Sequence, residues 1–213
     1  SCAEKPAACG SKGSEIQSAA PGLLGADSGS KDYLLCGVGG QGTVLASKLL
    51  AFAAMEQGLA VRTAETIGMA QRGGSVMTYV RIRQKIASPI IDEGGADLIL
   101  AFEKLEALRY AHYLKPNGEV LYSTQEIMPM PVVTGAAEYP KGIEAQLKGT
   151  GIDALKLAIE AGNAKSANSV MLGALCKKLG FDRDRFEEAL LSSIPQKTIE
   201  MNRKAFALGY DAV

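Results

Sequence analysis

Apolar and polar positions form a repeating pattern from Lys31 to about Lys141, in which short apolar runs alternate with segments of helical periodicity. This pattern is typical of a β-sheet that is covered by helices on both faces. The helices expected in this part of the chain are residues 43–55 and 104–114. The strands expected are residues 33–36, 60–65, 75–83, 97–102 and 119–123, with a further short strand at 131–134.

Residues 75–83 carry the clearest strand pattern, because β-branched side chains fall on one face while Arg81 and Arg83 share the other. We therefore expect a strand that is half exposed. The connection to the next apolar run, residues 86–91, is too short for a crossover helix. The sequence thus predicts an antiparallel hairpin between these two segments, and with it a mixed sheet.

Beyond Lys141 the pattern is mainly helical. Gly180 suits the left-handed residue after a helix, Asn168 and Asp182 suit helix caps, and Gly173 indicates a close contact between two helices. The predicted fold class is α/β, a three-layer α/β/α arrangement with a mixed, mostly parallel sheet and a helical C-terminal part. The helices expected in that part are residues 143–147, 152–161, 169–179, 183–191 and 196–208.

The N-terminal segment differs from the rest of the chain, because Ser, Gly, Ala, Pro and Lys dominate it. Such a composition offers little apolar surface to offset the entropy lost on ordering. We interpret residues 1–31 as a flexible extension and residues 32–213 as one domain, a size that suits a single α/β core. Cys2 and Cys9 lie in the extension and are assigned no role.

Charge and cysteine content narrow the class of protein. The chain has 23 basic and 23 acidic residues, a balance that does not indicate a nucleic-acid surface. Its four cysteines are scattered and lack the C-x-x-C spacing of zinc or iron–sulfur sites, which favours a reducing compartment. No apolar run approaches the roughly 20 residues of a membrane helix, and the N-terminus lacks a signal peptide's apolar core. We expect a cytoplasmic protein that binds neither nucleic acid nor membranes.

A glycine-rich loop follows the first expected strand. Gly37, Gly39 and Gly42 have the spacing of a dinucleotide-binding loop, and Gly40 adds further backbone freedom. Because the helix at 43–55 starts directly after it, the unpaired N–H groups of that helix would face whatever fills the loop. The expected guest is an anion such as phosphate; the alternative is a strand–helix turn that binds nothing.

A second unusual loop follows the second expected strand. Arg72 offers a planar two-pronged donor, and Gly73 and Gly74 let a neighbour approach the backbone closely. The three residues suit a carboxylate or phosphate, and equally an ordinary turn. Glu65 stands where a dinucleotide-binding fold places the acid that holds a ribose, although a helix cap or a surface charge also explains it.

Further polar residues follow other expected strands, at the sheet edge where ligands of open α/β sheets bind. These are Glu103 and the pair Ser123 and Thr124. Arg81 and Arg83 either extend a basic surface toward a phosphate-bearing ligand or protect a sheet edge from aggregation.

Two residues with reactive side chains have simpler interpretations. His112 is the single histidine and falls in an expected helix, where a surface or packing role is commoner than catalysis. Cys36 lies inside the first expected strand and is interpreted as a small buried apolar residue. No G-x-S-x-G turn indicates a hydrolase, and no catalytic or metal-binding residue is assigned.

Two segments in order, 37–42 (Gly-Val-Gly-Gly-Gln-Gly) and 68–76 (Gly-Met-Ala-Gln-Arg-Gly-Gly-Ser-Val), resemble the gamma-type domain of the 2-oxoacid:ferredoxin oxidoreductases. Within that family the chain is most similar to the small beta subunit of the indolepyruvate type. Segments 167–174 (Ala-Asn-Ser-Val-Met-Leu-Gly-Ala) and 200–209 add to the resemblance, which runs from about Lys31 to the C-terminus.

The resemblance implies an oxidoreductase subunit that is inactive alone. The implied reaction joins an aryl pyruvate, coenzyme A and oxidised ferredoxin to give an aryl acetyl-CoA, carbon dioxide and reduced ferredoxin. Because this chain lacks a G-D-G motif and a cysteine series, thiamine diphosphate and [4Fe-4S] clusters would belong to a larger partner subunit. The chain itself is therefore expected to work inside a heteromer of anaerobic metabolism.

The resemblance also gives the two loops a role: they would face the partner subunit and either hold the phosphates of coenzyme A or close the substrate pocket. Two alternatives remain open, an independent NAD(P)- or flavin-dependent oxidoreductase and a non-catalytic interaction module. The candidate cofactor-binding residues are Gly37, Gly39, Gly40, Gln41, Gly42, Arg72, Gly73 and Gly74.

Overall fold

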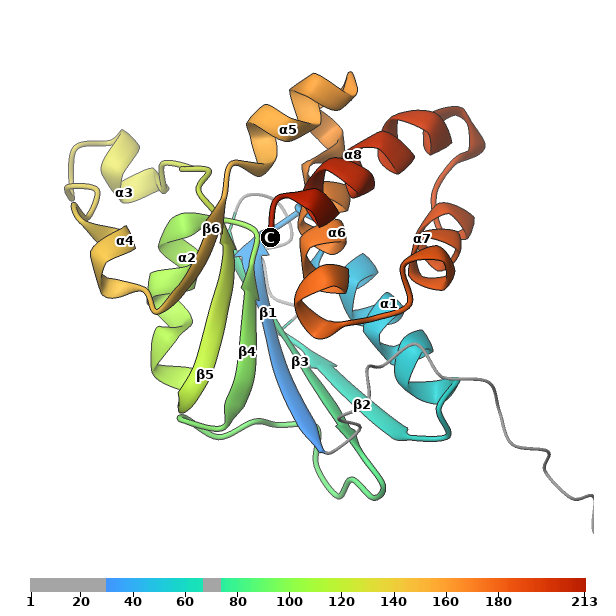
Figure 1. Ribbon diagram of the computed structural model, residues 1–213. Helices are drawn as coiled ribbons and strands as arrows, with labels where there is room; N and C mark the ends of the chain where they lie inside the picture. The colour runs from blue at the N-terminus through green and yellow to red at the C-terminus, as the bar shows by residue number, and fades with distance from the viewer. Residues whose placement is uncertain (1–29, 67–73) are drawn as a thin grey trace, which may run out of the picture.

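The computed structural model describes residues 30–66 and 74–213, so most of the predicted extension at 1–31 lies outside the described residues. Six strands form one sheet in the order β2-β3-β1-β4-β5-β6 (Figure 1). The strands are β1 (Lys31–Val38), β2 (Ala60–Glu65), β3 (Ser75–Arg83), β4 (Ala96–Ala101), β5 (Leu114–Ser123) and β6 (Gly149–Ile152).

Strand β3 is the strand that makes the sheet mixed. It runs antiparallel to both of its neighbours, β1 and β2, whereas β1, β4, β5 and β6 are mutually parallel. The predicted hairpin is wrong, because residues 86–91 form no strand and both edges of β3 are already paired. Instead, Arg81 Nη1 donates to the carbonyl oxygen of Ile90 at 2.7 Å, which ties this segment to the sheet.

The prediction that β3 is half exposed is also wrong. Met77 and Tyr79 on one face and Val80 and Ile82 on the other are all buried. The two faces join separate hydrophobic clusters on opposite sides of the sheet. The strict alternation of side chains is real, but the helical layers cover both faces of this inner strand.

Helices lie on both sides of the sheet, which confirms the predicted three-layer α/β/α architecture (Figure 1). One layer contains α1 and the C-terminal helices α5 to α8, and the other contains α2 and α4. The helices are α1 (Thr43–Met55), α2 (Lys104–Tyr110), α3 (Met130–Val133), α4 (Ile143–Gln146), α5 (Ala154–Ala161), α6 (Ala167–Leu179), α7 (Arg183–Ser192) and α8 (Ile199–Asp211), with short 3₁₀ turns η2 (Ala111–Tyr113), η3 (Ala164–Ser166) and η4 (Gln196–Thr198).

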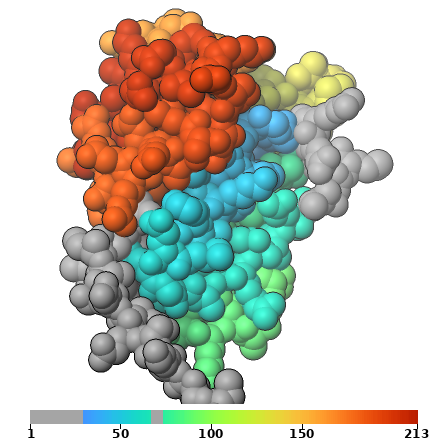
Figure 2. Space-filling view, turned by 90° about the vertical axis from the view of Figure 1, so that its right-hand side faces the viewer, coloured from blue at the N-terminus to red at the C-terminus, as the bar shows by residue number. Residues whose placement is uncertain are grey.

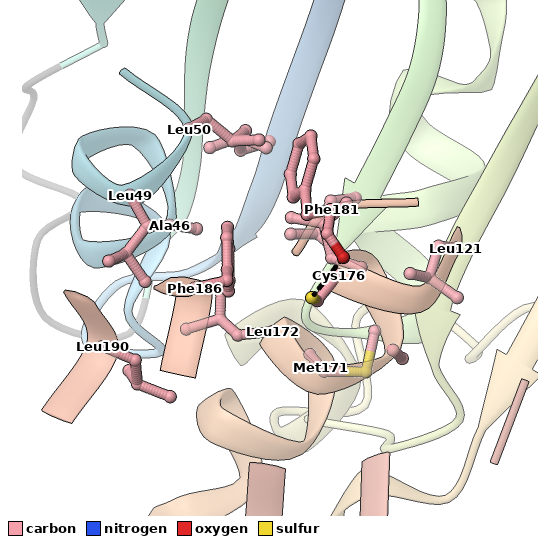
Figure 3. Close-up of a cluster of buried hydrophobic side chains, with 14 of the residues drawn as sticks. Ala46, Leu49, Leu50, Leu121, Met171, Leu172, Cys176, Phe181, Phe186 and Leu190 are labelled. Carbon is pink, nitrogen blue, oxygen red and sulfur yellow. Dashed lines mark hydrogen bonds between the residues drawn. The ribbon is translucent and has the colours of Figure 1, made fainter. Parts of the chain in front are cut away.

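Within the larger helical layer, the C-terminal helices pack tightly against α1. In Figure 2 the C-terminal helices, orange to red, adjoin the cyan segment that contains α1 and β2. Figure 3 shows Leu49 and Leu50 of α1 beside Phe181 and Phe186, side chains from the C-terminal part of the chain. All of these residues are buried in one cluster, so the C-terminal helices share a core with the sheet.

Several predicted helix signals are confirmed. Gly180 follows α6 with φ 65°, and Asp182 caps α7 by accepting a hydrogen bond from the Arg185 backbone N–H at 3.0 Å. A side chain at Gly173 would place Cβ 2.0 Å from the carbonyl oxygen of Phe206, so only glycine allows α6 and α8 to approach this closely. Asn168 lies within the first turn of α6 rather than before it.

Three local predictions are wrong. Residues 131–134, predicted as a strand, fall on the short helix α3 and its end. The predicted helix at 152–161 begins only at Ala154, because it is preceded by the unpredicted strand β6. The helix predicted at 104–114 ends at Tyr110 and is followed by the 3₁₀ turn η2, after which β5 begins at Leu114.

Strand β6 escaped prediction because it is short and rich in glycine. A Cβ at Gly149 would lie 1.8 Å from the carbonyl oxygen of Val120, and one at Gly151 would lie 2.8 Å from the Tyr122 ring. The absence of side chains at these two positions lets the strand approach β5. Glycine is normally depleted in strands, so the sequence pattern gave no signal for this pairing.

Candidate functional site

A cavity of about 430 Å³ opens at the carboxyl ends of the parallel strands. From β1 the chain passes into α1 on one face of the sheet, and from β4 it passes into α2 on the opposite face. Such a topological switch point is where open α/β sheets bind their ligands. The cavity is lined by Gly40, Gln41, Phe102, Ser123, Gln125, Ile127, Ala154, Ala164, Lys165, Ala167, Asn168 and Met171.

The glycine loop forms one wall of this cavity. Gly40 and Gly42 have φ angles of 100° and 93°, which L-residues with side chains rarely adopt. Gly37 has a different reason to be glycine, because a Cβ there would lie 2.9 Å from Gln41 Oε1 and 3.1 Å from Phe102 Cβ. Backbone conformation therefore favours glycine at positions 40 and 42, and close packing against Gln41 and Phe102 favours it at position 37.

Gln41 uses its side-chain amide to join the ends of two strands. Its Oε1 accepts a hydrogen bond from the backbone N–H of Val38 at 2.7 Å, and its Nε2 donates to the carbonyl oxygen of Phe102 at 3.0 Å. Val38 ends β1 and Phe102 follows β4, so the amide bridges the two strands at the switch point. Gln41 thus lines the cavity and also fixes the loop that carries it.

The two loops singled out in the sequence do meet. The backbone N–H of Gly39 donates to the carbonyl oxygen of Gly74 at 2.8 Å, so the end of the second loop lies against the first. Gly40 and Gln41 line the cavity, whereas Gly37 lies behind Gln41. Arg72 and Gly73 lie outside the described residues.

Residues from the helical part of the chain form another wall. Lys165 in η3 and Asn168 in α6 both line the cavity. A Cβ on Gly42 would lie 2.9 Å from Asn168 Nδ2, so the Asn168 side chain covers the end of the glycine loop. Neither residue follows a strand, so the sequence pattern indicated a helix cap at Asn168 and gave no role to Lys165.

Glu103 stabilises the wall that follows β4 and β5. It is 1% exposed, and its carboxylate accepts hydrogen bonds from the backbone N–H groups of Glu106 at 2.9 Å and Ile127 at 3.1 Å and from the Tyr139 hydroxyl at 3.2 Å. Burial raises the pKa of Glu103, although these hydrogen bonds act in the opposite direction. Of its partners, Ile127 lines the cavity directly.

Of the remaining sequence candidates, Ser123 lines the cavity, whereas Glu65, Arg81, Arg83 and His112 do not. Strand β3 separates β2 from β1, so Glu65 is not on the strand next to the glycine loop. Arg81 and Arg83 both pair with Asp32, at the amino end of β1, and do not form a free basic surface. His112 is exposed and lies 3.7 Å from Glu93 Oε1, which is consistent with its interpretation as a surface residue.

Cysteine chemistry finds no support among the described residues. Cys36 and Cys176 are buried in hydrophobic clusters on opposite sides of the sheet. Burial raises the pKa of the Cys36 thiol well above its ordinary value and that of Cys176 to about 12. Neither thiol lines the cavity, and Cys36 is confirmed as a buried apolar side chain.

Comparison with known proteins gives one family. The model of the pyruvate ferredoxin/flavodoxin oxidoreductase family matches residues 32–212. The chain is 43% identical over 194 residues to the indolepyruvate oxidoreductase subunit IorB of Thermococcus kodakarensis, covering 85% of this chain and 96% of that one. It is 29% identical to the ketoisovalerate oxidoreductase subunit VorA of Methanothermobacter marburgensis, of which the match covers only 35%.

A solved structure agrees with these sequence matches. The keto/oxoacid ferredoxin oxidoreductase gamma subunit of Geobacter sulfurreducens is 28% identical, with a TM-score of 0.63, over 85% of this chain and 97% of that chain. Within residues 30–66 and 74–213, no helix is both long and apolar enough to span a membrane.

Proposed function

Because this chain belongs to the pyruvate ferredoxin/flavodoxin oxidoreductase family and is the small subunit of a 2-oxoacid:ferredoxin oxidoreductase, we propose that its substrate is an aryl pyruvate such as indolepyruvate. The observation that carries the proposal is the 43% identity to an indolepyruvate oxidoreductase subunit, against 29% to a ketoisovalerate one. The products would be an aryl acetyl-CoA, carbon dioxide and reduced ferredoxin.

The proposal places the redox cofactors on a larger partner subunit. When bound there, thiamine diphosphate and [4Fe-4S] clusters would supply the decarboxylation and the removal of electrons. The described residues of this chain do not fit clusters, since Cys36 and Cys176 are buried apart and no group of three or more His, Cys, Asp and Glu could hold a metal.

The role proposed for this subunit is to complete the site at the subunit interface. The glycine loop, with Gly39, Gly40, Gln41 and Gly42, would face the partner together with Arg72, Gly73 and Gly74. These loops would either help to hold coenzyme A or close the substrate pocket. Support comes from the cavity beside Gly40 and Gln41 and from the hydrogen bond that joins Gly39 to Gly74.

The independent NAD(P)- or flavin-dependent enzyme is the weaker alternative. Its main support was Glu65 as a ribose-binding acid beside the glycine loop. Strand β3 lies between the strands that carry Glu65 and the loop, which removes the neighbouring acid that this binding mode uses.

The test is anaerobic purification of this chain with its partner, followed by assays that compare indolepyruvate, pyruvate and 2-ketoisovalerate under identical coenzyme A and ferredoxin concentrations. We expect the highest kcat/KM with indolepyruvate. A preference for a branched-chain oxoacid or pyruvate would overturn the substrate assignment. Arg72→Ala should raise the coenzyme A requirement or weaken assembly; an unchanged holoenzyme would remove Arg72 from the site.

A further inference from the structure

The glycine loop resembles a phosphate-binding loop in sequence, but its backbone donors are largely used within the chain. The N–H of Val38 donates to the Gln41 side chain, that of Gly39 donates to the Gly74 carbonyl, and that of Gln41 donates to the Val38 carbonyl at 3.1 Å. A loop that cradles phosphate presents these N–H groups to the ligand. Three of the five backbone N–H groups of residues 38–42 are thus used within the chain, which fixes the shape of the loop and, among the described contacts, leaves only those of Gly40 and Gly42 for a ligand.

The first turn of α1 is also closed off from the cavity. The lining includes Gly40 and Gln41 but neither Gly42 nor Thr43, and Thr43 is buried. The Asn168 side chain lies over Gly42, as the 2.9 Å approach of its Nδ2 to a Cβ at that position shows. A ligand in the cavity would thus meet Asn168 before it met the start of the helix.

The helical wall of the cavity carries a charged donor that is free of ion pairs within the described part of the chain. Lys165 is exposed, lines the cavity, and forms no ion pair with any residue in 30–66 or 74–213. The Asn163 side chain caps the turn by accepting from the Lys165 backbone N–H at 3.0 Å. Asn168 Oδ1 accepts from the Ser169 backbone N–H at 2.8 Å, which leaves the Asn168 N–H₂ group as its donor.

The charge of the cavity favours an anion. Lys165 is the charged side chain among the described lining residues, and that lining contains no Asp or Glu. The nearby carboxylate of Glu103 does not line it and is already held by three donors. An ammonium group beside neutral amides in a partly enclosed space attracts a phosphate more strongly than the same lysine would in open solvent.

We propose that the main phosphate-binding side of this cavity is the segment that carries Lys165 and Asn168, and that the glycine loop contributes mainly its shape. The inference rests on the proposed function, in which a phosphorylated co-substrate, coenzyme A, enters this cavity. It assigns the ionic contact to Lys165 and a neutral hydrogen bond to Asn168. Gln41 is then a positioning residue that holds the loop between β1 and β4.

The experiment uses the holoenzyme, assembled from this chain and its larger subunit, with coenzyme A as the probe. Lys165→Ala should raise the KM for coenzyme A about tenfold, the loss typical of one charged hydrogen bond, and change kcat less than about twofold. Calorimetric binding of coenzyme A should weaken by the same factor. Its dependence on salt concentration should also become shallower, because one ionic contact is lost.

Three further variants separate a loss of binding from a general effect on the protein. Lys165→Arg keeps the charge and should restore most of the affinity. Lys156→Ala removes another exposed lysine of the same helical part, one that does not line the cavity, and should leave coenzyme A binding unchanged. Asn168→Asp should weaken coenzyme A binding while leaving the KM for the 2-oxoacid nearly unchanged.

The outcomes distinguish this inference from the substrate assignment. If the holoenzyme prefers another 2-oxoacid, the substrate proposal fails, while coenzyme A binding still tests Lys165 with that substrate. Unchanged coenzyme A affinity in both Lys165→Ala and Asn168→Asp would overturn the inference even in an active indolepyruvate enzyme. A holoenzyme that does not bind coenzyme A, or an equal loss in Lys156→Ala, would overturn it as well.

Discussion

Two buried carboxyl groups lie at opposite ends of the sheet and are stabilised in opposite ways. Asp32, near the amino end of β1, is 3% exposed and pairs with two arginines, Arg81 at 3.0 Å and Arg83. Glu103, just past the carboxyl end of β4, is 1% exposed and accepts hydrogen bonds only from neutral groups. The end with paired charges is structural, and the end without them borders the cavity.

The two environments shift the two pKa values in opposite directions. Burial alone would raise the pKa of Asp32, but the hydrogen bonds and charges of Arg81 and Arg83 outweigh it and lower the value. For Glu103 burial dominates, and the pKa is raised. The carboxylate of Asp32 is thus compensated by arginine charges at the structural end of the sheet. The carboxyl group of Glu103, beside the cavity, has no such compensating charge among its hydrogen-bond partners in the described residues.

The largest effect is expected from removing the compensated carboxylate. Asp32→Ala leaves Arg81 and Arg83 without their shared partner, and Nε of Arg83 is already buried with no hydrogen-bond partner among the described residues. We expect the free energy of unfolding to fall by about 3 kcal/mol, the cost typical of breaking a buried ion pair. Urea unfolding of the isolated chain at pH 7 measures it.

Lys115→Ala is the matched control at the same end of the sheet. Lys115 and Asp97 form a pair at 2.6 Å that is partly exposed to solvent, so its loss should cost about 0.5 kcal/mol. Equal losses in the two variants would contradict the view that burial makes the Asp32 network important.

A smaller loss is expected at the other end. Glu103→Ala removes the cap of α2 and the acceptor that holds Ile127 and Tyr139, which should cost about 2 kcal/mol. Urea unfolding measures this change, with Glu126→Gln as an exposed control expected within about 0.5 kcal/mol of the parent. A loss larger than that of Asp32→Ala would reverse the comparison.

The pH dependence of stability should separate the two groups by sign. The pKa of Asp32 is lowered in the folded state, so its contribution is present above its ordinary pKa of 3.8 and is lost as the pH falls below it. The pKa of Glu103 is raised, so its contribution is present below 4.5 and is lost as the pH rises through its folded-state pKa.

Unfolding free energies of Asp32→Asn and Glu103→Gln, measured from pH 3 to 7, test these signs. Relative to the parent, Asp32→Asn should lose less stability on acidification below about pH 4. Glu103→Gln should lose less as the pH rises above about 4.5. If the difference in unfolding free energy between variant and parent changed with pH in the same direction for both variants, one of the two assignments would be wrong.

Apart from the two control variants, the smallest effect is expected from one hydrogen bond of the Glu103 network. Tyr139→Phe removes the hydroxyl that donates to Glu103 at 3.2 Å and leaves the two backbone donors in place. The loss should be about 1 kcal/mol, the net value of a single hydrogen bond, measured by thermal unfolding. No loss would mean that the two backbone donors satisfy this carboxylate alone.

Local signals in the sequence were enough for most of the fold. The helix at 43–55 has the predicted bounds, and Gly180 and Asp182 mark helix ends as expected. Gly173 has the predicted helix contact. These features depend on neighbouring residues or on a single backbone conformation, so a short stretch of sequence contains the relevant information.

Long-range pairing was where prediction failed. The sequence placed 75–83 in a hairpin with its neighbour, whereas β3 inserts between β1 and β2. The sequence also missed β6, since its glycines carry no hydrophobic pattern. Which strand pairs with which depends on the packing of the whole sheet. The alternation of apolar and polar side chains along one strand does not identify its partner strand.

The candidate site divides in the same way. The sequence by itself determined the glycine loop and the family, because each motif that identifies them is a short continuous segment. Only the tertiary structure decided that Gln41 bridges β1 and β4 and that Lys165 lines the same cavity as this loop. Residues 41 and 165 meet at one cavity through sheet pairing and helix packing, and those interactions act between segments distant in sequence.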